Sequence, residues 1–226
     1  MSRHVLRPIT CPQCSKESDF LVWDSINTTL DPEMYQAVRD GSAFLFKCPH
    51  CDCEVSVDYG FLYHQMDDSI MIQYCNSDEN FEEMLQMFTK KPNPESDVDE
   101  MVHNLLDDNY LIRIVRTRNQ LLEKLAIFDA GLDDRIIEII KLFYMVQLLE
   151  QNENEHVDEL LMFTDSTGKH ILKFLSEGMR FATAEITDEI YTDIQEKYGN
   201  NLPDLRKDDV VIDQDWALAH IKAHMR

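Results

Sequence analysis

The chain contains the sequence Cys11-Pro12-Gln13-Cys14 and repeats its pattern at Cys48-Pro49-His50-Cys51. A CxxC turn directs two thiolates at one ion, and backbone N–H groups of the turn donate hydrogen bonds to the sulfurs. One pair supplies half of a tetrahedral site, so two pairs of the same form predict one site with four cysteine ligands. Four thiolates suit Zn²⁺ or an iron centre, and structural zinc is the commoner use. Four protein ligands leave zinc no open position, which predicts a closed structural site.

Two other interpretations of the cysteine pairs stay open at this point. A single CxxC is also the motif of a redox dithiol, although that motif normally lies at a helix N-terminus after a strand and needs one copy. Four unrelated buried cysteines would not share the Cys-Pro-x-Cys pattern. The 33 residues between the pairs exceed the roughly 15–20 of short zinc modules. A short helix predicted at Pro32–Arg39 accounts for the extra length.

The region around the cysteines is rich in predicted strands. Glu54–Asp58 alternates between apolar and polar residues as a half-buried strand does. The short helix has Asp31 as its expected N-cap, Pro32 at its first position and Gly41 just past its end. The predicted strands are Phe20–Ile26, Ala43–Lys47, Cys53–Tyr59 and Ser69–Tyr74. We therefore expect a small antiparallel β domain that is zinc-ribbon-like and contains an inserted short helix.

The rest of the chain predicts a second α+β region, so the fold class is α+β. Two prolines in the polar stretch 90–97 mark the clearest linker. Helices are expected at Asp78–Thr89, Arg118–Ala130, Asp133–Gln151, between Thr187 and Gly199, and at Trp216–Met225. Strands are expected at Tyr110–Val115, Leu160–Thr164, Ile171–Leu175 and Phe181–Ile186. The predicted domains are a zinc-binding domain over 1–77, a helix and linker over 78–99, and a C-terminal α+β region over 100–226.

The paired Cys-Pro-x-Cys motifs resemble those of the CpXC domain family. The resemblance spans residues 9 to about 130, because four further stretches are also similar to family members: Trp23–Glu33, Phe61–Asp67, Arg113–Arg116 and Phe128–Asp134. The family has no assigned biochemical function. The resemblance implies a zinc-binding domain of bacteria or archaea.

One position in each cysteine turn departs from the usual zinc knuckle. Glycine often follows the second cysteine, where φ is positive, whereas this chain has Ser15 and Asp52 there. Aspartate tolerates that conformation better than serine does. We therefore expect the first knuckle to be slightly strained or differently shaped.

The composition limits the class of protein and its partners. The 226 residues include 21 Lys and Arg against 43 Asp and Glu, which gives a formal net charge of −22. Phosphate backbones are bound through Lys and Arg, so we expect no nucleic-acid binding, and anionic membranes are disfavoured for the same reason.

No apolar run approaches the roughly 18 residues of a membrane span, and the N-terminus lacks the apolar segment of a secretory signal. We expect a cytoplasmic protein, in whose reducing compartment paired thiols usually indicate metal or redox chemistry.

Other candidate ligands have plainer structural explanations. Cys53 lies two residues beyond Cys51 and could exchange into the metal shell, but an unligated cysteine behaves as a small hydrophobe and suits a strand core. Cys75 is expected in the core, and His50 is expected to be solvated. His220 and His224 lie one helical turn apart and could share a metal, yet no third ligand accompanies them.

A candidate catalytic group consists of His64 with Asp67 and Asp68, in which a carboxylate would hold the imidazole as a general base. A structural histidine in a turn between strands is the plainer explanation. The densest basic cluster is Arg113, Arg116 and Arg118, at a predicted strand end and helix start where an anion can lie on the helix dipole. Internal pairing is the plainer explanation here too, for example with Asp129, Asp133 or Asp134. The nucleotide-binding motifs GxxxxGK[ST] and GxGxxG are absent from the sequence.

The sequence thus favours a non-catalytic protein-interaction module with structural zinc and a protein partner, for which a basic protein is suited by charge. The second region offers more surface, including a contact for a homo-oligomer. The alternative is an enzyme of hydrolytic or nucleotide chemistry that uses a groove with His64, Arg113 and Arg116. Nucleic-acid binding, a common role of zinc ribbons, is the weakest hypothesis because of the charge.

Overall fold

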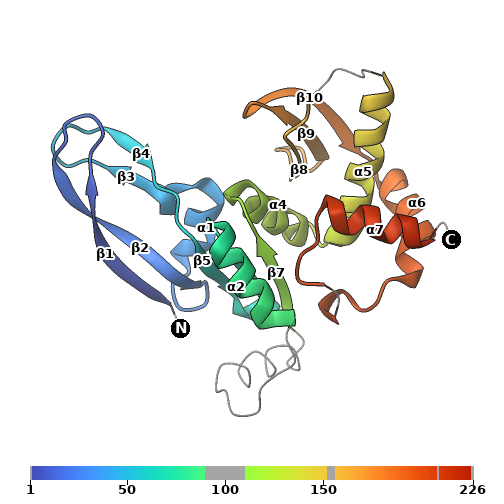
Figure 1. Ribbon diagram of the computed structural model, residues 1–226, viewed down its shortest axis with the longest axis horizontal. Helices are drawn as coiled ribbons and strands as arrows, with labels where there is room; N and C mark the ends of the chain where they lie inside the picture. The colour runs from blue at the N-terminus through green and yellow to red at the C-terminus, as the bar shows by residue number, and fades with distance from the viewer. Residues whose placement is uncertain (1, 90–109, 152–155, 208, 225–226) are drawn as a thin grey trace, which may run out of the picture. The chain divides into compact units, whose positions relative to one another are not determined.

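The computed structural model describes residues 2–89, 110–151, 156–207 and 209–224, and the side chains of Lys207 and His224 are not described (Figure 1). These residues form six α-helices and ten strands in three sheets, so the α+β class is confirmed. The chain divides into two compact units, Met1–Arg118 and Asn119–Arg226. No helix in the described ranges is long and apolar enough to cross a membrane.

The first unit is built on a five-stranded sheet. Its strands lie in the order β1 (Arg3–Thr10), β2 (Glu17–Asn27), β5 (Phe61–Gln65), β6 (Ile70–Tyr74) and β7 (Leu111–Val115). The sheet is mixed rather than antiparallel as expected, because β2 pairs with β5 and β6 pairs with β7 in parallel. Parallel neighbours need a crossover connection, and the chain between β2 and β5 supplies one.

That crossover contains a helix and a second, two-stranded sheet. Helix α1 (Glu33–Asp40) is followed by the 3₁₀ turn Ser42–Phe44 and by the antiparallel pair β3 (Leu45–Lys47) and β4 (Glu54–Ser56). Gly41 ends the helix at φ +82°, as predicted, because only glycine adopts that conformation without cost. Asp31 is not the N-cap. Pro32 occupies the cap position without a side-chain hydrogen bond, and the Asp31 carbonyl accepts from the backbone N–H of Met34.

Two features of the five-stranded sheet differ from the sequence-based expectation. Strands β1 and β5 were not predicted, and β7 was expected to open the second region. The structure pairs β7 with β6 instead, from Ile70 opposite Leu111 to Tyr74 opposite Val115. All five residues of β7 are buried. Helix α2 (Asp78–Thr89) lies between β6 and β7 in the chain, and the predicted linker after it lies outside the described residues.

The second unit packs helices on a three-stranded antiparallel sheet. The sheet has the order β10 (Met179–Ile186), β9 (His170–Ser176), β8 (Glu159–Thr164). The helices are α4 (Arg118–Asp129, which begins at the last residue of the first unit), α5 (Asp134–Gln151), α6 (Asp188–Tyr198) and α7 (Gln214–His224). The Thr187 hydroxyl caps α6 as predicted, accepting from the Ile190 N–H at 3.3 Å.

The core of the second unit lies between α5 and this sheet. Ile136, Ile137 and Ile140 of α5 are buried against Leu172 and Phe174 of β9. Tyr144 and Leu148 of α5 pack at the edge of the same cluster. Phe143 of α5 is 40% exposed, although it continues the 3.6-residue apolar period of Ile136 and Ile140.

A network of buried charges joins α4 to α5. Lys124 places its Nζ 2.8 Å from Asp134 Oδ2 and 2.7 Å from the carbonyl oxygen of Ile212. Lys141 places its Nζ 3.0 Å from Glu123 Oε2 and 2.9 Å from Glu138 Oε1. The other Glu123 oxygen accepts from the backbone N–H of Met162 in β8 at 2.6 Å.

Burial and the oppositely charged neighbours shift the pKa values of this network in opposite directions, and burial raises the pKa of Glu123. Burial lowers the pKa of Lys141, but Glu123 and Glu138 outweigh that effect and raise it above its ordinary value. Removal of one partner would leave a buried charge without its counterion, which costs far more than the loss of a surface ion pair.

Candidate metal centre

Each cysteine pair forms the tip of a β-hairpin. Cys11 and Cys14 lie in the loop that joins β1 to β2, where Thr10 pairs with Glu17. Cys48 and Cys51 lie in the loop that joins β3 to β4, where Lys47 pairs with Glu54. Two hairpin tips that carry CxxC turns are the arrangement expected of a zinc-ribbon-like fold.

The two loops have the same backbone geometry. In the first, the carbonyl of Cys11 accepts from the N–H of Ser15 at 2.9 Å, and in the second the carbonyl of Cys48 accepts from Asp52 at 3.0 Å. The residue after each second cysteine is left-handed, with φ +58° at Ser15 and +56° at Asp52. The positive φ is therefore confirmed at both positions. The expectation of a different shape for the first loop is wrong, because the same hydrogen bonds close both turns.

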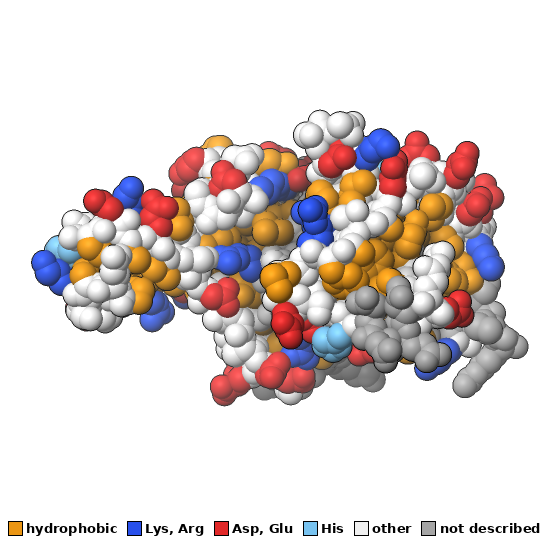
Figure 2. Space-filling model, turned by 90° about the horizontal axis from the view of Figure 1, so that it is seen from above, with side chains coloured by type: hydrophobic (Ala, Val, Ile, Leu, Met, Phe, Trp, Pro, Cys, Tyr) orange, Lys and Arg blue, Asp and Glu red, His pale blue; other side chains and the backbone are white. Residues whose placement is uncertain are grey.

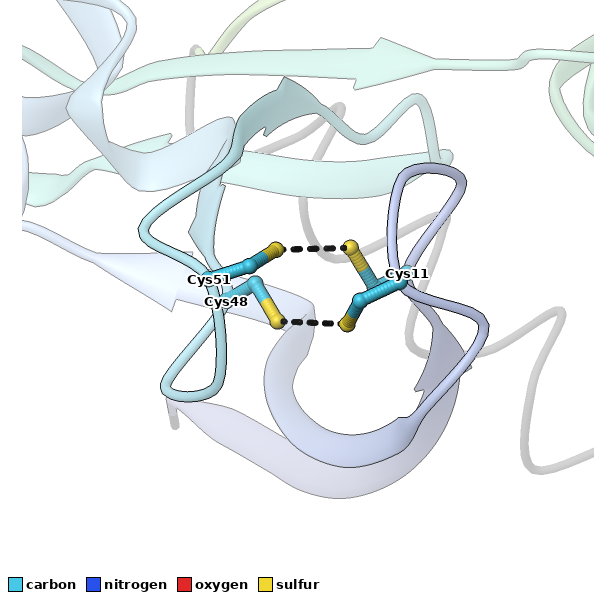
Figure 3. A group of neighbouring side chains, drawn as sticks. Cys11, Cys48 and Cys51 are labelled. Atoms are coloured by element: carbon cyan, nitrogen blue, oxygen red, sulfur yellow. Dashed lines mark hydrogen bonds between the residues drawn. The ribbon is translucent and has the colours of Figure 1, made fainter.

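The four thiols face one another across the two hairpins (Figure 3). The Sγ atoms of Cys11 and Cys51 are 3.6 Å apart, and those of Cys14 and Cys48 are 3.7 Å apart. All four sulfurs lie within 4.8 Å of one another, and none is in a disulfide. A tetrahedron with Zn–S bonds of about 2.3 Å has S–S edges of about 3.8 Å. The donor set therefore fits a four-coordinate metal ion.

The surroundings of the thiols shift the pKa values of Cys11 and Cys51 in opposite directions. Hydrogen bonds from the backbone of Cys14 and Gln13, against the opposing effect of burial, lower the pKa of the Cys11 thiol to about 6. The backbone N–H of Cys53 also lowers the pKa of Cys51, but burial and the three other thiols outweigh it and raise that pKa to about 12. The group thus accepts a first negative charge readily and resists a further one, which a bound cation would relieve.

An apolar floor closes one side of the site. Cys11 and Cys48 are fully buried and pack with Phe46, and Phe20 and Val55 lie against this cluster. A floor of this kind keeps water from the sulfurs on that side.

The remaining cysteines and His50 lie outside the group of four thiols. Cys53 is partly buried beside Cys11 and Cys48, and burial raises the pKa of its thiol. Cys75 is buried in the first unit, where its N–H donates to the carbonyl of Val115, and burial raises its pKa too. His50 is exposed, and its backbone N–H lies 3.5 Å from Cys48 Sγ.

His64 does not form the predicted pair with a carboxylate. It lies within β5 rather than in a turn, with Nε2 3.0 Å from the Tyr110 hydroxyl and Nδ1 3.4 Å from Asn27 Nδ2. Burial lowers the pKa of the ring. Asp67 accepts from the Thr29 hydroxyl instead, and Asp68 accepts from the side-chain amide of Gln65.

Asn27 and Tyr110 are thus the partners that sequence reasoning missed for His64. The pairing of β2 with β5 brings Asn27 opposite His64. The order Asn27-Thr28-Thr29 was a local signal for the Asx turn that Asn27 forms with the Thr29 N–H at 3.0 Å. Nothing local pointed to Tyr110.

The three arginines do not form one basic face. Arg113 is 1% exposed and donates to the Ile112 carbonyl at 2.8 Å. Arg116 pairs with Asp78 and Glu82 of α2, at 2.6 and 3.7 Å, and its guanidinium lies 3.5 Å from the centre of the Phe81 ring. Arg118 donates to the Ser56 hydroxyl at 2.7 Å.

Internal pairing is therefore correct for Arg116, although Asp78 and Glu82 were not among the carboxylates named as examples. Asp133 pairs with Arg135 and Asp134 with Lys124. The predicted metal pair of His220 and His224 on α7 stays a prediction, because the side chain of His224 lies outside the described residues. The His220 ring stacks on the ring of Trp216.

The two hairpin tips and their four thiols define a zinc-ribbon-like α+β protein with a site suited to a metal ion. The chain belongs to the CpXC family, because the model of that family, described as CpXC protein, matches residues 9–141. The match includes both cysteine pairs. No curated protein matches the chain, and no solved structure matches it.

Proposed function

We propose that the chain is a cytosolic, non-catalytic protein-interaction module whose N-terminal unit is held together by one zinc ion bound to Cys11, Cys14, Cys48 and Cys51. The observation that carries the proposal is the convergence of these four thiols from two hairpin tips. Four thiolates fill a tetrahedral shell, so the ion has no open position for substrate or water.

The role of the metal in this proposal is mechanical. Strands β3 and β4 have three residues each, and a two-stranded hairpin of that size is not stable alone in water. Zinc would cross-link this hairpin to the β1–β2 hairpin and hold it over the apolar floor. Binding free energy at such a site acts as folding free energy.

The enzyme hypothesis has less support. It needs His64, Arg113 and Arg116 around one groove. In the sheet His64 pairs with Met71, whereas Arg113 pairs with Ile72, the next residue along β6. Successive residues of a strand point to opposite faces, so His64 and Arg113 point away from each other.

The charge supports a basic protein as the partner. The formal net charge of −22 attracts a cationic surface and speeds its encounter, and salt weakens the effect. On the face drawn in Figure 2, Lys and Arg side chains are scattered among acidic and hydrophobic ones. The negative net charge also disfavours nucleic acid, which needs a basic surface to hold phosphates.

Purified protein should carry one zinc ion per chain after loosely bound metal has been removed. The reason is that four thiolates from two knuckles complete one tetrahedron. Elemental analysis against protein concentration measures the ratio. Iron in place of zinc, or no tightly bound metal, would refute the zinc assignment.

The interaction half of the proposal predicts a salt-sensitive complex. After affinity purification of the full chain from its own cells and identification by mass spectrometry, a basic protein should co-purify at low salt. High salt should release it, because the encounter is electrostatic. Recovery of nucleic acid, of an acidic protein only, or of no protein would contradict this half and leave the zinc assignment intact.

A further inference from the structure

Two sequence motifs remain without a role in the metal site. They are the stretches Trp23–Glu33 and Phe61–Asp67, which follow the two cysteine pairs. The structure brings them together as β2 and β5, in parallel, with Ser25 opposite Leu62 and Asn27 opposite His64. Parallel strands end at the same edge of a sheet, so the turns that follow them are neighbours.

Burial in the core explains most of the large apolar residues in these two stretches, but not all of them. Ile26 and Tyr63 are fully buried, and Trp23 and Phe61 nearly so, which assigns them to the core. Leu30 and Met66 are the exceptions, because they are 60% and 50% exposed. Two large apolar side chains exposed on neighbouring turns leave apolar surface that a partner could cover.

Hydrogen bonds fix the two turns to each other. Asn27 is 4% exposed, and its side chain binds both turns: Oδ1 accepts from the Thr29 N–H at 3.0 Å, and Nδ2 lies 3.8 Å from Met66 Sδ. Its backbone carbonyl accepts from Leu30 at 3.1 Å. The Thr29 hydroxyl donates to Asp67 at 3.3 Å. A surface ordered in this way loses little entropy when it binds.

The two turns themselves carry only acidic charge, and the nearby Arg3 is paired with Asp24. The sequence has no Lys or Arg in residues 17–38 or 48–89, which include both turns, while Asp31, Asp67 and Asp68 lie in or beside them. Another basic side chain that reaches this region, Arg39, donates to the Tyr63 hydroxyl at 2.8 Å and to Gln65 Oε1 at 3.2 Å. Its charge is therefore directed at the protein itself.

We propose that the surface formed by residues 29–31 and 66–68 docks a basic segment of a partner protein, with an apolar side chain of that segment between Leu30 and Met66 and its Lys or Arg side chains against Asp31 and Asp67. The proposal rests on the interaction function given above and names the surface that performs it. An unbranched methionine suits a contact of this kind because its side chain adapts to the partner.

The test uses the full, metal-loaded chain and short synthetic peptides in which Leu or Met is flanked by Lys and Arg, each with a counterpart carrying Glu for every basic residue. Fluorescence anisotropy should show binding of the basic peptides, weakened by salt. Leu30→Ser and Met66→Ser should each weaken it about tenfold, as expected for the loss of an anchor worth about 1.4 kcal/mol. Leu6→Ser is the matched control, since Leu6 of β1 is also 60% exposed, and it should bind as the unsubstituted chain does.

Several results would overturn the surface assignment. They are an unchanged affinity in both Leu30→Ser and Met66→Ser, an equal loss in Leu6→Ser, equal binding of the acidic peptides, or no binding of the basic ones. Zinc content and melting temperature establish that each variant is folded. If Leu30→Ser and Met66→Ser still retain the basic partner found by affinity purification, the interaction function stands and this surface is wrong. If affinity purification finds no basic partner, the interaction function itself fails.

Discussion

Cys11→Ser or Cys48→Ser should remove the zinc ion and unfold the N-terminal unit. Both thiols are fully buried and belong to the group of four. The binding free energy of structural zinc is about 10–16 kcal/mol at pH 7 in zinc-finger peptides. That is as large as the whole stability of a typical domain, about 5–15 kcal/mol. We therefore expect the metal to decide whether this unit folds.

Elemental analysis and tryptophan fluorescence check this result together. Trp23 lies in the first unit and is 7% exposed, so unfolding of that unit exposes it to water. The Trp216→Phe background makes Trp23 the only tryptophan of the chain. Cys53→Ser is the control, because Cys53 is only partly buried and lies outside the group of four thiols. It should keep its zinc, and a loss of metal from Cys53→Ser would show that the ligands are wrongly assigned.

Lys124→Met should destabilise the second unit by about 3–5 kcal/mol, the usual cost of breaking a buried ion pair. The Lys124 side chain is 3% exposed, and Asp134, 2.8 Å from its Nζ, is fully buried. Methionine has a similar length but no charge, so Asp134 and the Ile212 carbonyl would lose their donor in a place water does not reach. Denaturant unfolding, followed through Trp216 in a Trp23→Phe background, measures the change.

Two further variants separate the charge effect from other causes. Lys222→Met, on an exposed part of α7, should change stability by no more than about 0.5 kcal/mol. Asp134→Asn added to Lys124→Met should recover much of the loss, because it removes the buried negative charge that Lys124 balances. Equal stability of Lys124→Met and the unsubstituted chain, or no recovery in the double variant, would show that the network does not hold the second unit together.

The metal site could be predicted from the sequence because its chemistry is local. The two CxxC turns each need four residues, and the positive φ of Ser15 and Asp52 follows from the turn itself. Most helices were predicted for a similar reason: their apolar period and end signals, such as Thr187 before α6, lie within a few residues. An apolar period of 3.6 residues does not show how much of a helix its neighbours cover. Phe143 fits the period of α5 and is nevertheless exposed.

The arrangement of the strands required the tertiary structure. Strand β1 has one buried or half-buried residue in eight, so it lacks the alternation that marks a strand, and its partner β2 defines it. Strand β7 is separated in sequence from β6 by α2 and the undescribed residues 90–109, and no local pattern says which sheet receives it. The partners of His64 and Arg116 could not be identified from the sequence because they come from other elements of the fold.

The sequence by itself therefore determined the group of four cysteines, the α+β class and the negative net charge, because each depends on residue types and on spacings of a few positions. Only the tertiary structure decided that the sheet is mixed, that His64 and Arg113 point to opposite faces, and that the turns after β2 and β5 meet around Asn27. These features depend on which strands pair and in what register. Pairing is chosen by the total burial and hydrogen bonding of residues far apart in the chain, which no single stretch of the sequence contains.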